Sequence, residues 1–128
     1  MFRRASSFGW SLGLWLLTAC DGGIPAERPS VGCTEVLVTL RVQVLDASGA
    51  PVPDATVSAT HLETGNTITS VTGSDGITDA VNEQLGAGTV RLSARGGSKL
   101  SDSADVRWTC DECHCYPEPG SVQLRLHP

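Results

Sequence analysis

Most of the chain from residue 36 onward alternates between apolar and polar residues with a period of two. The longest such stretch covers residues 36–44, where the apolar positions are Val36, Val38, Leu40, Val42 and Val44. Alternate residues of an extended strand share one face, and valine favours strands because it is β-branched. The stretch therefore predicts a β-strand with one buried face.

Further short segments of the same kind follow along the chain. They are residues 55–60, 67–72, 77–81, 89–94, a segment around Val106 and Trp108, and residues 122–126. Turns rich in Gly, Asp and Pro separate them, and no helical period interrupts the series. Seven short strands separated by turns predict an all-β fold, a β-sandwich. Trp108 has the same parity as Val106, so we expect it to pack inside.

The first twenty residues have a different pattern, which is typical of an export signal. Arg3 and Arg4 precede an apolar stretch at residues 8–17, shorter than the roughly 20 residues of a transmembrane helix. The stretch ends at residues 17–20, LTAC, which resemble the lipobox of bacterial lipoproteins. In that family the signal is cleaved before the cysteine, which carries the lipid. An ordinary signal peptide followed by an unrelated cysteine is the alternative.

The lipobox resemblance implies a layout in three parts. Residues 1–19 form the lipoprotein signal peptide, and residues 20–33 form the lipidated N-terminus and a flexible tether rich in Gly and Pro. Residues 34–128 form the β-sandwich domain, with a Cys-rich loop at 110–115. Cys20 then anchors an exported protein to the cell membrane or the outer membrane, since two or more acyl chains bind a bilayer stably.

Part of the predicted domain resembles a known family of β-sandwiches. Residues 42–57, VQVLDASGAPVPDATV, are similar to the opening of a carboxypeptidase regulatory-like domain. Residues 72–76 and 85–94 are similar to later segments of that domain, so the resemblance covers roughly residues 38–97. It implies an Ig-like or transthyretin-like sandwich of seven strands. It also implies an appended module without catalytic residues, and we therefore expect no enzyme and no cofactor.

Four cysteines remain once Cys20 is assigned to the lipid: Cys33, Cys110, Cys113 and Cys115. In an exported chain an even number predicts two disulfides, and four cysteines allow three pairings. Cys33 must pair with a member of the cluster if all four are oxidised. A bridge such as Cys33–Cys110 would close a long loop and stabilise the fold by about 4 kcal/mol, against about 2 kcal/mol for a bridge within the cluster.

The same cluster carries two chemical alternatives. Residues 110–114 match the C-x-x-C-H pattern of covalent haem attachment, in which the histidine ligates iron. Cys110, Cys113, His114 and Cys115 also have donor atoms that suit zinc or copper. Either reading would make the chain a redox or metal protein.

Composition and charge narrow the functional classes. The 128 residues carry a formal net charge of −5, so the chain lacks the basic surface of a nucleic-acid-binding protein. No nucleophile elbow, phosphate-binding loop or zinc-binding helix motif occurs. We therefore expect a non-catalytic, membrane-anchored module with a structural or binding role in the bacterial cell envelope. Its partner, a protein or an envelope polymer, is not identified by the sequence.

Overall fold

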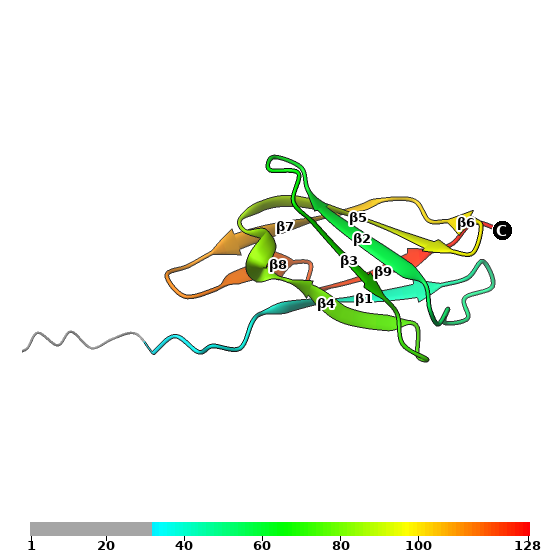
Figure 1. Cartoon of the computed structure of the whole chain (residues 1–128), viewed down its shortest axis with the longest axis horizontal. Coiled ribbons are helices and arrows are strands. Elements are labelled where there is room, and N and C mark those ends of the chain that lie inside the picture. The colour runs from blue at the N-terminus through cyan, green and yellow to red at the C-terminus, as the bar shows by residue number, and fades with distance from the viewer. Residues whose placement is uncertain (1–31) are drawn as a thin grey trace, which may run out of the picture. The chain divides into compact units, whose positions relative to one another are not determined.

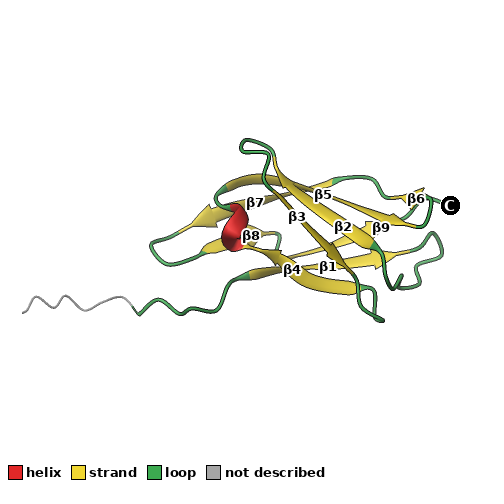
Figure 2. Ribbon diagram, in the orientation of Figure 1, coloured by secondary structure: helices red, strands yellow, loops and turns green. Residues whose placement is uncertain are grey.

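The computed structural model describes residues 32–128, which fold almost entirely into β-strands (Figure 1). The strands are β1 (Thr39–Leu45), β2 (Thr56–His61), β3 (Thr67–Val71), β4 (Ile77–Asn82), β5 (Gly88–Gly96), β6 (Lys99–Leu100), β7 (Ala104–Cys110), β8 (Cys115–Glu118) and β9 (Ser121–Arg125). A single 3-10 turn, η2 (Glu83–Leu85), is the only helical element of this part of the chain (Figure 2). The predicted all-β class is confirmed. The predicted signal peptide, Cys20 and the tether up to residue 31 lie outside the described residues.

The strands form two sheets that pack face to face. One sheet has the order β4-β1-β9, and the other has the order β3-β2-β5-β7-β8, with β6 paired to β5 (Figure 1). Neighbouring strands are antiparallel except β1 and β9, which pair in parallel. Because both sheets bury one face against the other, β1, β2, β5 and β7 bury alternate residues, as their sequences predict.

The buried core lies between the two sheets and is almost wholly aliphatic. Its fully buried members are Leu40, Val42, Val44, Ala55, Val57, Ala59, Val81, Val90 and Leu92, joined by Val106 and Trp108 at 1% exposure. Trp108 is thus inside, as its parity predicts. Its indole Nε1–H is buried and has no hydrogen-bond partner among the described residues, so the ring contributes through packing.

The structure has nine strands where seven are expected from the sequence. The two additional strands are β6, which has only two residues, and β8, which contains Pro117. Two residues are too few to establish a period, and proline lacks the N–H that a central strand needs. β8 accommodates Pro117 because it is the last strand of its sheet.

The first strand also starts later than the alternation predicts. Val36 has the right parity but is 76% exposed, and β1 begins only at Thr39. Thr39 pairs with Asn82, the last residue of β4, so no strand lies beside the residues before it. The backbone N–H of Val38 instead donates to the Glu83 carboxylate at 3.0 Å. A strand ends where its hydrogen-bonded partner strand ends, and the sequence of one segment does not show where its partner ends.

Candidate functional site

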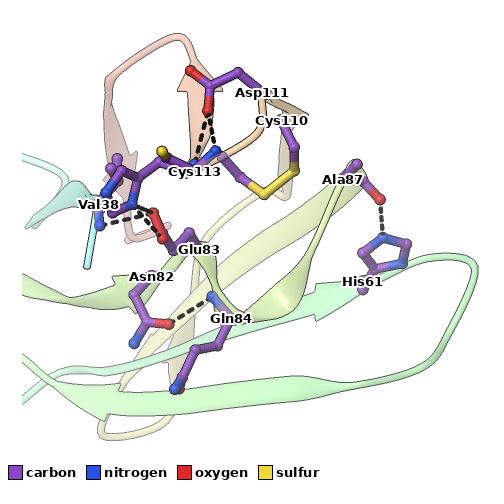
Figure 3. Close-up of a disulfide and its surroundings, with 11 residues drawn as sticks. Val38, His61, Asn82, Glu83, Gln84, Ala87, Cys110, Asp111 and Cys113 are labelled. Carbon is purple, nitrogen blue, oxygen red and sulfur yellow. Dashed lines mark hydrogen bonds and ion pairs between the residues drawn. A yellow bond between two sulfur atoms is a disulfide. The ribbon is translucent and has the colours of Figure 1, made fainter. Parts of the chain in front are cut away.

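The Cys-rich loop is a tight hairpin between β7 and β8 that a disulfide closes at its base. Cys110 and Cys115 face each other in the strand register and form one disulfide. Within the loop, Asp111 Oδ1 accepts hydrogen bonds from the backbone N–H groups of Cys113 and His114, each at 2.8 Å (Figure 3). These two donors hold the pKa of the Asp111 carboxyl below its ordinary value. The aspartate thus fixes the turn.

A second disulfide joins this hairpin to the segment that precedes β1. Cys33 bonds Cys113 across a sequence separation of 80 residues, with the two Cα atoms 5.3 Å apart. Both expected disulfides are therefore present, and Cys33 pairs with a member of the cluster as predicted. The partner is Cys113, and the bridge fixes the place where the chain enters the domain.

His114 links three segments that are distant in sequence. Its Nδ1 lies 2.8 and 3.0 Å from the two carboxylate oxygens of Glu83, and its Nε2 lies 3.0 Å from the hydroxyl of Thr34. The His114 and Glu83 side chains keep only 12% and 11% of their exposure. Because a carboxylate only accepts, the Nδ1–H donates to Glu83. In the neutral ring, Nε2 then accepts from the Thr34 hydroxyl.

Glu83 is positioned by the short η2 turn. The side chain of Asn82 caps this turn by accepting from the Gln84 N–H at 2.9 Å, and the Glu83 carboxylate also accepts from Val38 (Figure 3). The hydrogen bond from His114 is the largest effect that lowers the pKa of Glu83 from its ordinary value, and partial burial opposes it. Glu83 therefore stays ionised and holds both the hairpin and the entering segment.

The order carboxylate, imidazole, hydroxyl is also that of a Ser-His-Asp triad. Acyl transfer additionally needs N–H donors aimed at the developing oxyanion. The backbone N–H groups of His114 and of its neighbour Cys113 both donate to Asp111. We interpret the Glu83–His114–Thr34 contacts as structural, because they tie the entering segment to the hairpin.

The structure also bears on the metal and haem alternatives. Cys110, Cys113 and Cys115 are all disulfide-bonded, whereas metal ligation needs thiolates and haem attachment needs free thiols. Both ring nitrogens of His114 are engaged by Glu83 and Thr34. Within residues 32–128 no group of three or more His, Cys, Asp or Glu side chains is arranged to hold a metal ion. The oxidised hairpin does not fit either group.

The ionised state of Glu83 leads to a pH prediction. Its lowered pKa contributes stability above the ordinary carboxyl pKa of about 4, and that contribution is lost as the pH falls through the lower folded value. We expect Glu83→Gln to be less stable than the wild type near neutral pH, with the difference shrinking in acid. Urea unfolding across a pH series measures it. The control is Glu112→Gln, an exposed acid of the same hairpin; a pH-independent difference for Glu83→Gln would contradict the assignment.

A second histidine is built into the far end of β2. His61 is buried, and its Nε2 lies 2.7 Å from the carbonyl oxygen of Ala87 (Figure 3). Its Nδ1 accepts from the N–H groups of Glu63 and Thr64. The ring therefore caps the β2–β3 turn and fixes the start of β5. Both nitrogens are satisfied, which assigns this histidine a structural role.

Gly88 is required by the position of His61. Its φ is +129°, and a Cβ there would lie 2.7 Å from His61 Nε2. We expect Gly88→Ala to lower the free energy of unfolding by about 1–3 kcal/mol, from backbone strain and overpacking together. Gly86→Ala is the matched control, since Gly86 has φ +87° but nothing within 4 Å of its Cβ position. Urea titrations should show the larger loss for Gly88→Ala; equal losses would remove the contact with His61 from the explanation.

One groove lies away from the hairpin, on the outer face of the six-stranded sheet. Its volume is about 240 Å³, and Thr56, Ser58, Ser93, Ala94, Arg95, Leu100 and Ser101 line it. No motif in the sequence marks this groove. The only sequence signal is that the outward positions of residues 55–60 and 89–94, except Arg91, carry hydroxyl groups.

The functional assignment of this chain rests on the residues described above. A scan against models of protein families gave no match, and a search of the curated proteins gave none either. Among the described residues no helix is both long and apolar enough to cross a bilayer.

Proposed function

We propose that the chain is an exported bacterial lipoprotein whose β-sandwich is a non-catalytic structural or binding module of the cell envelope. The observation that carries this is the state of the reactive side chains. All four cysteines of residues 32–128 are in disulfides, and both ring nitrogens of His61 and His114 are engaged. Cysteines in disulfides and imidazoles with both nitrogens hydrogen-bonded stabilise the fold. They are then not free to act as nucleophiles or general bases in a reaction.

The proposed localisation rests on the cysteine count. Five cysteines occur in the sequence, and the four in the folded domain pair with one another. Cys20 is the fifth, and it is the cysteine that the lipobox resemblance assigns to the lipid. Two disulfides in a small domain are typical of proteins in an oxidising, extracytoplasmic compartment.

We further infer that the domain is an Ig-like or transthyretin-like module of the carboxypeptidase regulatory-like kind. The residues that carry the resemblance build turns: Asp46 Oδ1 accepts from the N–H groups of Ser48 and Ala50, each at 2.9 Å. Gly76 has a φ of +75°, and a Cβ there would lie 2.9 Å from Pro51 and from the Val44 carbonyl. This agrees with a family in which such residues shape the fold.

Metabolic labelling with palmitate tests the anchor directly. The wild-type chain, expressed with its signal in a bacterial host, should incorporate label and fractionate with membranes. Cys20→Ser should lose the label, while Cys33→Ser serves as the control that keeps it. An unlabelled wild-type protein would overturn the lipoprotein proposal.

A redox role for the Cys110–Cys115 disulfide is the second candidate. Two observations favour it. Cys110 is exposed at the end of β7, and the Cys33–Cys113 disulfide lies in the same hairpin. A dithiol could reach its sulfur and be oxidised as the bridge opens. Alkylation followed by intact-mass measurement, without and with a graded dithiol buffer, tests this. A structural bridge should stay closed until the domain unfolds, whereas a redox bridge should open in the folded state.

A further inference from the structure

The groove on the outer face of the six-stranded sheet is built from two rows of side chains. Thr56 on β2 lies opposite Arg95 on β5, and Arg95 lies opposite Leu100 on β6. Ser58 and Ser93 lie opposite each other in the next row. The four positions on β2 and β5 alternate with buried residues such as Val57 and Ala94, so their side chains face outward. Leu100 lies on the same face because it pairs with Arg95.

The polar groups of the groove differ in whether they already have partners. Ser101 Oγ accepts from the Ala94 N–H at 2.9 Å and donates to the Asp102 carbonyl, so it is part of the wall. The hydroxyls of Thr56, Ser58 and Ser93 make no hydrogen bond with another described residue. The groove thus presents three hydroxyl groups that, within residues 32–128, are available to a ligand.

Arg95 differs from Arg91, which lies four residues earlier on the same face of β5. Arg91 forms a two-pronged contact with Asp105, at 2.8 and 3.0 Å. No carboxylate of residues 32–128 lies within ion-pair distance of Arg95. A guanidinium without a partner, in a depression lined by hydroxyls, is suited to a carboxylate because its planar fork donates two parallel hydrogen bonds.

We propose that this groove binds a uronic acid residue, a sugar ring that bears a carboxylate. The carboxylate pairs with Arg95, and the hydroxyls of Ser58, Ser93 and Thr56 donate to and accept from the ring hydroxyls. Leu100, which is 53% exposed, contacts the C–H face of the ring. The volume equals that of about eight water molecules, enough for one ring. The proposal rests on the binding role of the module and names its ligand class.

The expected affinity for one sugar unit is low. The lining contains no aromatic side chain for stacking, and a groove on the outer face of a sheet leaves part of the ligand in water. We expect a dissociation constant of about 1 mM for a single unit, with tighter binding of longer chains through several copies on one membrane. The affinity should fall as salt screens the Arg95 charge.

The test is a titration of the full isotope-labelled chain in detergent micelles, followed by amide NMR. Glucuronate is the probe, and glucose and acetate separate the contributions of the hydroxyls and the carboxylate. Glucuronate should shift signals of β2, β5 and β6 saturably, and should bind more tightly than either control. Arg95→Gln should weaken it about tenfold or more, as loss of a charge-assisted contact implies. Ser93→Ala should weaken it by a smaller factor.

The matched control is Arg91→Gln, which removes the same charge from the same strand outside the groove. It should leave glucuronate binding unchanged, and the spectra of all variants report that the fold is intact. Absence of saturable shifts would overturn the proposal, as would equal binding of acetate or glucose, or equal losses in Arg91→Gln and Arg95→Gln. Palmitate labelling at Cys20 is independent of the groove, so failure here is distinguishable from failure of the lipoprotein proposal.

Discussion

Replacing Cys33 and Cys113 together by serine should lower the free energy of unfolding by about 4.5 kcal/mol. The disulfide closes a loop with a sequence separation of 80 residues, and the entropy that a crosslink removes from the unfolded chain grows with loop length. The loss is comparable to the whole stability of many small domains, so we expect much of the variant to unfold near physiological temperature. Urea unfolding under non-oxidising, non-reducing conditions measures it.

The matched control for that variant is the pair Cys110→Ser and Cys115→Ser. The same treatment gives only about 2 kcal/mol for a sequence separation of 5 residues, although both bridges lie in one hairpin. The difference between the two double variants therefore reports loop length and not the loss of sulfur. Equal losses would show that the long bridge acts through local contacts such as Thr34 with His114.

The Trp108→Ala variant should lose about 3–5 kcal/mol of folding free energy. Trp108 is the largest fully buried side chain of the domain, and the buried core cluster is otherwise aliphatic. A close-packed core relaxes only in part, so the substitution leaves a cavity. Urea titration measures the loss, and circular dichroism checks that the strands persist.

Tyr116→Ala is the control for the tryptophan variant. Tyr116 lies on the neighbouring strand β8 and is 47% exposed, so its loss should change the stability by no more than about 0.5 kcal/mol. If Trp108→Ala were equally mild, the interior would have to be far more adaptable than a close-packed core allows.

The inward face of most strands is predictable from the sequence because burial on one side imposes a period of two. Val42, Val57 and Leu92 are examples, and each is fully buried. The alternation within one segment does not predict a strand correctly where the strand's extent depends on the neighbouring strand. Val36 alternates correctly yet is exposed because β4 ends at Asn82, and β8 escapes prediction because Pro117 is tolerated only at the edge of the sheet.

The contacts of the hairpin could be predicted only in part. Oxidation of the four cysteines follows from compartment and number, but the choice among three pairings depends on which residues the folded chain brings together. Cys110 and Cys115 are opposite in register, which leaves Cys113 for Cys33. The link from His114 to Glu83 spans 31 residues and the link to Thr34 spans 80, so neither has a local signal.

The Cys33–Cys113 bridge also determines how the domain responds to tension. A pull on the chain ahead of Cys33 passes through a covalent bond into the β7–β8 hairpin, and it bypasses the pairing of β1 with β4 and β9. Without the bridge, the same load would act first on the end of β1 and peel this central strand away from its neighbours. In a protein held at this end against a moving surface, the hairpin would thereby bear the load before β1 does.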